Sequence, residues 1–386
     1  MSADSGVCDL CGSLASTVVI DSATGRSLRS DRVVLPLPLR KVACERCGLV
    51  RDGGSFDPVA APIYEDDYHV NLDEHFFYTV DGRTPRSGVF AGWIAELVGA
   101  DRLRRASRVL EVGAGSGLLV QALAAMLPWA EVSGVELGAA AVAEARRHGR
   151  AVRQGGMDQE RPESFDLICS IAVLEHVPSP TRYLRALRRL LKPGGRLVLA
   201  QPTQDVPSYD VFFADHLRHF GSGHLTAYAG KCGFDEVASQ VGHCLMPNFS
   251  IHVFRAAESR PWEWAGEAVP TTCAETARRV VADMAALDER IRRLAAGRQP
   301  LGVFGVFEVF ALARAYSTLG SAEIACGLDD NPAAADRLDA GFPVVVPESC
   351  VDYGVNDVLL TMNKLYYAQA SARLARLGVR TYPVLS

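Results

Sequence analysis

Four of the ten cysteines form two C-x-x-C pairs near the N-terminus, and a glycine follows each pair. Two such pairs can hold one Zn²⁺ in a tetrahedron of thiolates, while each glycine lets the chain turn back toward the sulfurs. Four sulfur ligands leave no open position, so the predicted zinc is structural. A redox-active pair and unrelated core cysteines are the alternatives. A hairpin of residues 16–22 and 33–39 is expected between the pairs. The predicted metal ligands are Cys8, Cys11, Cys44 and Cys47.

The stretch VLEVGAGSGL, residues 109–118, is also suited to chemistry, because an apolar run leads directly into closely spaced glycines. Their spacing is G-x-G-x-G, whereas a dinucleotide-binding turn has G-x-G-x-x-G. The shorter spacing disfavours a pyrophosphate resting on the N-terminus of the following helix. It favours a ligand that has no phosphate and carries a zwitterionic amino-acid arm.

The elements that must position these residues follow an α/β pattern. Apolar strands alternate with helical segments, which is typical of a parallel sheet. The expected strands are 108–113, 130–136, 165–171 and 195–202. A long amphipathic helix is expected at about 273–297 as a linker, followed by a second α/β pattern. The predicted domains span 1–58, 59–258 and 259–386.

Further motifs follow the glycine turn in an order shared by one enzyme family. Glu136 ends the second strand, where an acid can accept both hydroxyls of a ribose. FDLICSIAVLEHVPSP supplies the fourth strand and a Leu-Glu-His-Val turn, and LLKPGGRLVLAQP supplies a helix, a turn and the fifth strand. The chain therefore resembles the class I S-adenosylmethionine-dependent methyltransferases. The resemblance implies an α/β fold with a Rossmann-like, mostly parallel seven-stranded sheet, and S-adenosylmethionine as cofactor. It argues against an NAD-dependent oxidoreductase.

The resemblance also implies cofactor contacts, with one departure from the family. Glycine stands where the family has the acid that meets the adenine amine, so Asp158 is expected to take this role with Met157 against the adenine ring. A solvated loop acid is the alternative for Asp158. Tyr64 and Tyr68 either approach the methionine arm or the substrate, or pack the N-terminal layer. The implied cofactor residues are Glu111, Gly113, Ala114, Gly115, Gly117, Glu136, Leu137, Met157, Asp158, Tyr64 and Tyr68.

Cysteine pairs, methyltransferase core and C-terminal α/β domain together resemble the zinc-containing C-methyltransferases of nucleotide-linked 4-keto-deoxysugars. The segment DVFFADHLRHF, residues 210–220, stands where that family has a Glu-His-Leu-x-Tyr-Phe motif. The resemblance implies that His216 removes a proton beside the ketone and that Asp215 orients His216. It also implies that His176 donates to the sugar or to the enolate, with a purely architectural role as the alternative.

Departures from this family leave the acceptor open. Asp215 replaces a glutamate, and Phe213 and His219 stand where the family has tyrosine hydroxyls. The loop 305–308 lacks a glycine-rich turn, so no second cofactor site is expected. The leading prediction is C-methylation of a nucleotide-linked keto-deoxysugar in natural-product or polysaccharide biosynthesis. The alternatives are O- or N-methylation of a sugar or small metabolite, and a non-catalytic S-adenosylmethionine-binding protein.

Charge and hydropathy limit the expected partners. A net charge of −5 and a pI of about 6.0 argue against a nucleic-acid-binding protein. The sequence has no apolar run near the ~18 residues that cross a bilayer, and its N-terminus lacks the apolar core of a signal peptide. We therefore expect a cytoplasmic enzyme with a small-molecule substrate, and the sequence does not decide between a monomer and a homodimer.

Overall fold

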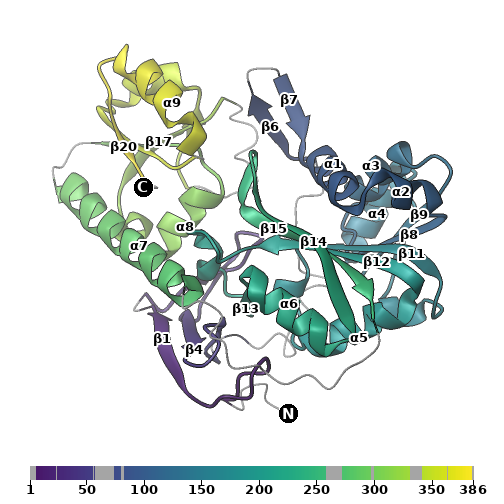
Figure 1. Ribbon diagram of the computed structural model, residues 1–386. Coiled ribbons are helices and arrows are strands. Elements are labelled where there is room, and N and C mark those ends of the chain that lie inside the picture. The colour runs from purple at the N-terminus through teal and green to yellow at the C-terminus, as the bar shows by residue number, and fades with distance from the viewer. Residues whose placement is uncertain are drawn as a thin grey trace. The chain divides into compact units, whose positions relative to one another are not determined.

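The fold is taken from a computed structural model, which consists of two compact units (Figure 1). The structure describes residues 6–22, 24–54, 56, 74–79, 82–257, 272–296, 300–330, 341–362 and 364–384. The first unit comprises Met1–Val18, Lys41–Val211 and Asp215–Ala277. The second comprises Val19–Arg40, Phe212–Ala214 and Arg278–Ser386. The division into three domains with boundaries after residues 58 and 258 stays a prediction.

A seven-stranded sheet forms the centre of the first unit (Figure 1). Its strands are β8 (Arg108–Val112), β9 (Glu131–Glu136), β10 (Val152–Gln154), β11 (Phe165–Ile171), β12 (Leu191–Pro202), β14 (Phe234–His243) and β15 (Met246–Ala256). Their order is β10-β9-β8-β11-β12-β15-β14. The pairs from β10 to β12 are parallel, and β15 is antiparallel to both of its neighbours. The predicted mostly parallel α/β sheet is confirmed.

Side chains of this sheet enter two separate hydrophobic cores. In β11, Ile168 belongs to a cluster with Leu184, whereas the next residue, Cys169, belongs to a cluster with Trp93. Successive side chains of a strand point to opposite faces, so helices must cover both faces to bury them. The helices of this unit are α1 (Arg86–Val98), α2 (Ala100–Arg105), α3 (Leu118–Met126), α4 (Ala139–Arg147), α5 (Pro180–Leu190) and α6 (Ser222–Lys231).

The sequence of α5 shows why a helix forms at this point. Its buried residues include Leu184 and Leu187, three positions apart on one face. Pro180 occupies the first turn, where a missing N–H breaks no helical hydrogen bond. Ser179 caps the helix, because its Oγ accepts the N–H of Arg182 at 3.4 Å.

Four short strands of the N-terminal and central sequence form a second sheet. They are β1 (Ser16–Asp21), β4 (Arg40–Cys44), β5 (Val50–Asp52) and β13 (Arg218–His219), in the order β1-β4-β5-β13. The expected hairpin of 16–22 with 33–39 is found with its second strand displaced, because β1 pairs with β4, while Ser22 N–H donates to the carbonyl oxygen of Leu39 at 2.9 Å. The intervening β2 (Ser27–Leu28) and β3 (Val34–Leu35) pair with each other. Pairing of β13 with β5 fixes the loop that carries the predicted catalytic histidine.

The second unit contains a five-stranded parallel sheet, so the predicted C-terminal α/β pattern is confirmed. Its strands are β16 (Leu301–Phe304), β17 (Ile324–Leu328), β18 (Val344–Val345), β19 (Asp357–Leu360) and β20 (Arg380–Pro383), in the order β18-β17-β16-β19-β20. The later helices of the chain are α7 (Thr272–Ala296), α8 (Glu308–Tyr316) and α9 (Tyr367–Ala375). The long helix expected at about 273–297 corresponds to α7.

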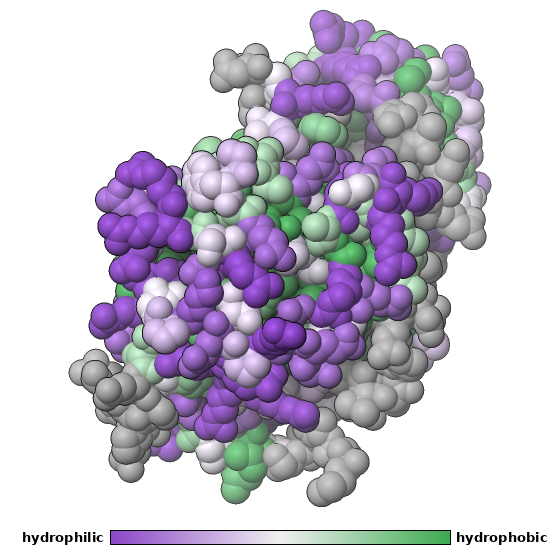
Figure 2. Space-filling view, turned by 90° about the vertical axis from the view of Figure 1, so that its right-hand side faces the viewer, coloured by the Kyte–Doolittle hydropathy of each residue, from purple (hydrophilic) through white to green (hydrophobic). Residues whose placement is uncertain are grey.

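The remaining described elements are short. They are the β6–β7 hairpin (Phe76–Thr79 and Gly82–Pro85) and 3₁₀ helices at Met157–Gln159, Leu174–His176, Tyr209–Phe212, Thr318–Gly320, Pro347–Tyr353 and Lys364–Tyr366. Figure 2 shows one face of the molecule, on which hydrophilic side chains predominate and hydrophobic ones form small separate groups. Among the described helices, none is both long enough and apolar enough to span a membrane.

Candidate cofactor site and active site

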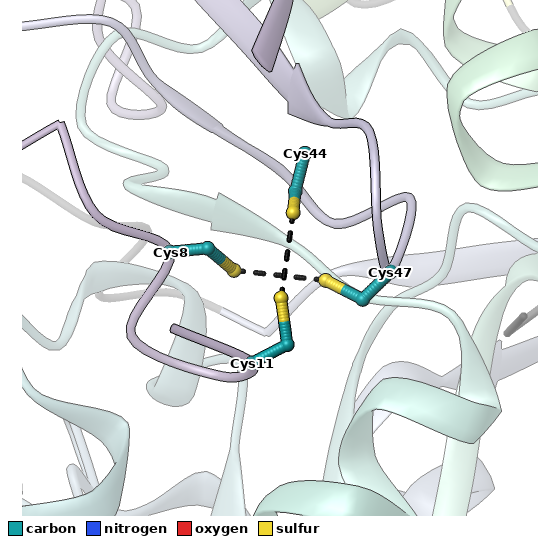
Figure 3. A group of neighbouring side chains, drawn as sticks. All are labelled: Cys8, Cys11, Cys44 and Cys47. Carbon is teal, nitrogen blue, oxygen red and sulfur yellow. Dashed lines mark hydrogen bonds between the residues drawn. The ribbon is translucent and has the colours of Figure 1, made fainter. Parts of the chain in front are cut away.

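The four paired cysteines point toward one centre (Figure 3). Cys8 and Cys11 precede β1, while Cys44 ends β4 and Cys47 follows it. The Sγ atoms of Cys8 and Cys47 are 3.6 Å apart, and those of Cys11 and Cys44 are 3.5 Å apart. All four sulfurs lie within 4.8 Å of one another. The structure thus brings the four predicted metal ligands together.

This arrangement of sulfurs fits a structural zinc ion. A tetrahedron with Zn–S bonds of about 2.3 Å has sulfur–sulfur edges of about 3.8 Å, close to the observed separations. Gly12 and Gly48 have φ angles of +75° and +72°, which favour glycine. Their N–H groups donate to the carbonyl oxygens of Cys8 and Cys44, at 2.7 and 2.9 Å. Each glycine therefore closes the turn that brings its cysteine pair together.

The three glycines at the carboxyl end of β8 differ in their surroundings. All have positive φ angles, from +52° at Gly115 to +77° at Gly117. A Cβ on Gly113 would lie 2.5 Å from Cγ2 of Val173, and one on Gly117 would lie 2.7 Å from Cγ2 of Val152. A Cβ on Gly115 would meet no described atom within 4 Å. The open side of the turn is therefore at Gly115, where a ligand can approach the backbone.

Two carboxyl groups lie near the turn and interact with each other through their charges. Oε2 of Glu136 accepts the N–H of Gly115 at 2.9 Å, and Oε1 accepts the N–H of Gly138 at 2.8 Å. Glu111 is buried, and its Oε2 has no hydrogen-bond partner within the described structure. Burial, followed by the charge of Glu136, raises the pKa of Glu111 well above its usual value. An unpaired buried oxygen beside an open glycine turn fits the polar cofactor that the resemblance implies.

The remaining predicted cofactor residues have different surroundings. Leu137 directly follows β9 and is 45% exposed. Met157 and Asp158 lie in the 3₁₀ helix after β10, where Met157 packs partly buried against the core and Asp158 is exposed. Ala114 is buried in the glycine turn. The predictions for Tyr64 and Tyr68 fall outside the described residues.

A buried carboxylate joins two histidines in the segment before β13. Nδ1 of His216 donates to Oδ1 of Asp210, and Nδ1 of His219 donates to Oδ2 at 2.6 Å. Because an ionised carboxylate can only accept, both imidazoles carry a proton on Nδ1. All three residues are at most 5% exposed. Asp210 thus contacts His216 directly, and the expectation that Asp215 orients His216 stays a prediction.

His176 approaches the same cluster from the 3₁₀ helix after β11. Its Nδ1 donates to the carbonyl oxygen of Asp215 at 3.1 Å and lies 3.5 Å from Oδ2 of that residue. The rings of His176 and His216 are perpendicular, with centroids 4.5 Å apart. Glu175 is 2% exposed, and neither of its carboxylate oxygens has a partner among the described residues. The three predicted catalytic residues thus meet in one buried site.

Burial and neighbouring charges shift the pKa values of the histidines and of Glu175 in this site in different directions. Burial alone would lower the pKa of His216, but Asp210, followed by two further carboxylates, raises it to about 9. Burial lowers the pKa of His176 to about 4 and that of His219 to about 4. Burial also raises the pKa of Glu175 to about 7. Near neutral pH, His216 is therefore cationic, whereas His176 and His219 are neutral. The carboxyl group of Glu175 is about half ionised at that pH.

Sequence reasoning missed three residues of this site. Asp210 precedes His216 by six positions, a spacing that neither strand nor helix periodicity would bring together. Glu175 lies in a turn, where a charged side chain is ordinarily solvated. Lys41 comes from β4, and its buried Nζ donates to the carbonyl oxygen of His216 at 2.6 Å. The sequence feature that could have revealed Asp210 and Glu175 is the clustering of acids and histidines in the Leu-Glu-His-Val turn and in residues 210–220.

Comparison with known proteins is consistent with this geometry. Residues 85–252 match the family described as "Methyltransferase domain". The ubiquinone biosynthesis O-methyltransferases of Pseudomonas savastanoi pv. phaseolicola (strain 1448A / Race 6) and Pseudomonas aeruginosa (strain LESB58) are each 34% identical to the chain over 126 residues. That match covers 30% of this chain and 52% of each relative. The chain therefore spans about half the length of the curated relatives it matches.

Solved structures show a weaker likeness. An S-adenosylmethionine-dependent methyltransferase from Mesorhizobium loti matches with 18% identity over 38% of this chain and 90% of that one, at a TM-score of 0.33. The N,N-8-amino-8-demethyl-D-riboflavin dimethyltransferase of Streptomyces davawensis matches with 19% identity over 44% of this chain and 54% of that one, at a TM-score of 0.37. Neither likeness bears on activity. Residues 85–252 therefore match a methyltransferase domain, and the strand order and the glycine turn after β8 agree with that match.

Proposed function

We propose that this chain is an S-adenosylmethionine-dependent C-methyltransferase that acts on a nucleotide-linked keto-deoxysugar through an enolate. The observation that carries the proposal is the buried cluster of His176, Asp210 and His216 next to the glycine turn. Val173 precedes His176 by three residues and lies against Gly113, so the histidine turn and the cofactor turn are neighbours. Ligands of open α/β sheets bind at this carboxyl edge of the strands.

The chemistry of such a reaction matches the residues of the cluster. S-adenosylmethionine, when bound, supplies the methyl group as an electrophilic sulfonium. The protein must remove a proton from the carbon beside the ketone and must hold the enolate oxygen with a hydrogen-bond donor. The His176–His216 pair, with Asp210 on Nδ1 of His216, offers acid–base groups in a site that is nearly closed to water.

Buried amides at the carboxyl end of β12 support a hydroxyl-rich acceptor. Oε1 of Gln201 has no hydrogen-bond partner within the described part of the chain, and neither amide atom of Gln204 has one. Both residues are at most 1% exposed. An unpaired buried amide is costly unless a ligand completes its hydrogen bonds. The hydroxyl groups of a sugar can donate to and accept from such amides.

We also propose that the four-cysteine group holds a structural Zn²⁺. The convergence of the sulfurs and the two glycine-closed turns support this assignment. Thiolates without a metal would repel one another, whereas a bound zinc ion contributes directly to folding.

O-methylation is the second candidate function. This candidate is supported by the curated relatives, which are named O-methyltransferases and match 30% of this chain. Transfer to a hydroxyl group needs a base but no ketone. Because His219 and Phe213 stand where sugar C-methyltransferases have tyrosines, an acceptor other than a keto-sugar is compatible with the site.

One experiment separates these functions. The full chain is incubated with S-adenosylmethionine and thymidine- or uridine-diphosphate-linked 4-keto-6-deoxyhexoses that carry deuterium at the carbons beside the ketone, and the products are examined by mass spectrometry and NMR. The proposal expects a product in which the methyl group is bonded to one of these carbons and has replaced its deuterium. A methyl group bonded to oxygen would favour O-methylation, and no methylation of any keto-sugar would contradict the proposed acceptor.

A further inference from the structure

Glu175 is the most unusual polar residue of the site. It is 2% exposed, and its two carboxylate oxygens have no hydrogen-bond partner in the described structure. Its backbone is fixed, because Leu217 N–H donates to its carbonyl oxygen at 2.7 Å. A buried carboxyl group without hydrogen-bond partners costs stability, and the charge of His216 offsets only part of that cost, since the pKa of Glu175 stays raised. A functional role explains its place better than a structural one.

The neighbours of Glu175 are imidazoles rather than solvent. Glu175, His176 and His216 each bring one polar atom within 4.8 Å of the others. His216 is the cationic member, because Asp210 accepts from its Nδ1 and the carboxyl groups of Asp215 and Glu175 lie nearby. His176 is a neutral imidazole with its proton on Nδ1, since that atom donates to a backbone carbonyl. The site therefore pairs a desolvated carboxyl group with an imidazolium.

We infer that Glu175 is the general base of the proposed reaction and that protonated His216 holds the enolate oxygen. This inference rests on the proposed function and reverses the role that the resemblance implies for His216. An unsolvated carboxylate is a stronger base than one in water, and enolising active sites pair such a base with a fixed hydrogen-bond donor. An imidazolium that is stabilised by three carboxyl groups is suited to donate and poorly suited to accept a proton.

The bond changes of this step balance as follows. The C–H bond beside the ketone breaks, its proton goes to a carboxylate oxygen of Glu175, and its electron pair enters the enolate. The enolate oxygen accepts a hydrogen bond from His216. The enolate carbon then bonds the methyl carbon as the S–C bond breaks and its electron pair stays on sulfur. Glu175 finally releases its proton to water.

The test measures proton exchange without methyl transfer. The full chain with S-adenosylhomocysteine is mixed in D₂O with a thymidine-diphosphate-linked 4-keto-6-deoxyhexose, and loss of the proton beside the ketone is followed by NMR. Wild type should exchange this proton, and Glu175→Gln should exchange it at least about 10²-fold more slowly. The matched control is Glu131→Gln. Glu131 is an exposed carboxyl group at the start of β9, so this variant should exchange the substrate proton at the wild-type rate.

The dependence of exchange on pH tests the two roles separately. The titratable groups around Glu175 and His216 include His176, Asp210, Asp215, His219 and Lys41, whose Nζ donates to the carbonyl oxygen of His216. A carboxylate base and an imidazolium donor predict a rate that rises near pH 7 and falls near pH 9. A neutral His216 acting as base predicts a rate that rises near pH 9 and does not fall.

Three outcomes would overturn the inference, and they differ in what they say of the proposed function. Exchange by Glu175→Gln at the wild-type rate would show that Glu175 is not the base and would leave the proposed function intact. A neutral imidazole at His216 in ¹⁵N-histidine spectra at pH 8, assigned with His216→Gln, would show that His216 is not the cationic donor. That result also leaves the proposed function intact, and its measurement needs no substrate. No exchange by wild type would contradict both. Unchanged S-adenosylhomocysteine affinity of Glu175→Gln by calorimetry shows that the variant is folded.

Discussion

Asp210 accepts a hydrogen bond from Nδ1 of His216, and both side chains are nearly inaccessible to solvent. The second oxygen of the same carboxylate accepts from Nδ1 of His219. Burial alone would raise the pKa of Asp210, but the charges and hydrogen bonds of the two histidines hold it well below its usual range. Asp210 thus sets the tautomer of His216 and contributes the largest charge effect on its pKa, so we expect Asp210 to act as a positioning residue.

Replacing this carboxylate tests its role. Asp210→Asn keeps the size of the side chain but removes the charge that raises the pKa of His216. We expect turnover to fall by about 10²-fold or more while S-adenosylmethionine affinity stays unchanged. The pKa of His216, followed by ¹⁵N NMR, should fall in the variant. Asp235→Asn, a carboxyl group paired with Arg255 at the surface, is the matched control. An unchanged His216 pKa would remove Asp210 from this role.

The cysteine group predicts a metal-dependent fold. Cys44→Ser should lose bound zinc and lower the unfolding temperature, because a structural metal contributes its binding free energy to folding. Metal content by mass spectrometry and thermal unfolding check this. Cys244→Ser, at an exposed single cysteine, should keep both properties. Full stability of wild type after complete removal of metal would contradict a structural zinc.

Two glycines of the cofactor turn should respond differently to alanine. Gly115→Ala adds a Cβ that meets no described atom, so the variant should lose only about 1–2 kcal/mol of stability from its left-handed backbone. It should still bind S-adenosylmethionine much more weakly, since the added methyl group enters the open side of the turn. Gly117→Ala places its Cβ 2.7 Å from Val152 and should mainly lower stability. Equal cofactor affinity of wild type and Gly115→Ala would place the cofactor elsewhere.

Protonation of Glu236 should lower the free energy of unfolding at acidic pH. Burial would raise its pKa, but hydrogen bonds from His252, Ser239 and Thr226 lower it from 4.5 to about 2. A depressed carboxyl pKa stabilises the fold above pH 4.5, and this contribution is lost as the pH falls toward 2. The contribution is at most about 3 kcal/mol, and less after solvent screening, since the side chain is 24% exposed.

Denaturant unfolding of Glu236→Gln measures this contribution. The free energy of unfolding of the variant should lie below that of wild type at pH 7, and the difference should shrink toward zero near pH 2. A difference that is the same at both pH values would show that the variant acts through packing instead.

The sheet was predictable from the sequence, whereas the catalytic contacts were not. Strands such as β11 are buried on both faces, so they read as continuous apolar runs between helical segments. The segment that holds Asp210 and His216 has no such periodicity, and its position depends on pairing of β13 with β5. The second strand of the expected N-terminal hairpin was misplaced for a similar reason, since the partner of β1 is set by the whole sheet.

Glu175 shows the limit of reading a motif by resemblance. The Leu-Glu-His-Val turn drew attention to His176, and the acid before it had no assigned role. Only the fold shows that this carboxyl group is enclosed and unpartnered beside two imidazoles. Burial is a tertiary property, so a single sequence reveals it only where hydrophobic periodicity is strong.

We propose that the glycine turn and Glu136 bind S-adenosylmethionine, and calorimetric titration of the full chain tests this binding without any acceptor. Wild type should bind one S-adenosylmethionine per chain. Glu136→Gln should bind at least about 10-fold more weakly, because charge-assisted hydrogen bonds are lost, while Glu131→Gln at the start of the same strand should bind as wild type does. No saturable binding by wild type, or equal affinity of Glu136→Gln and wild type, would contradict the account.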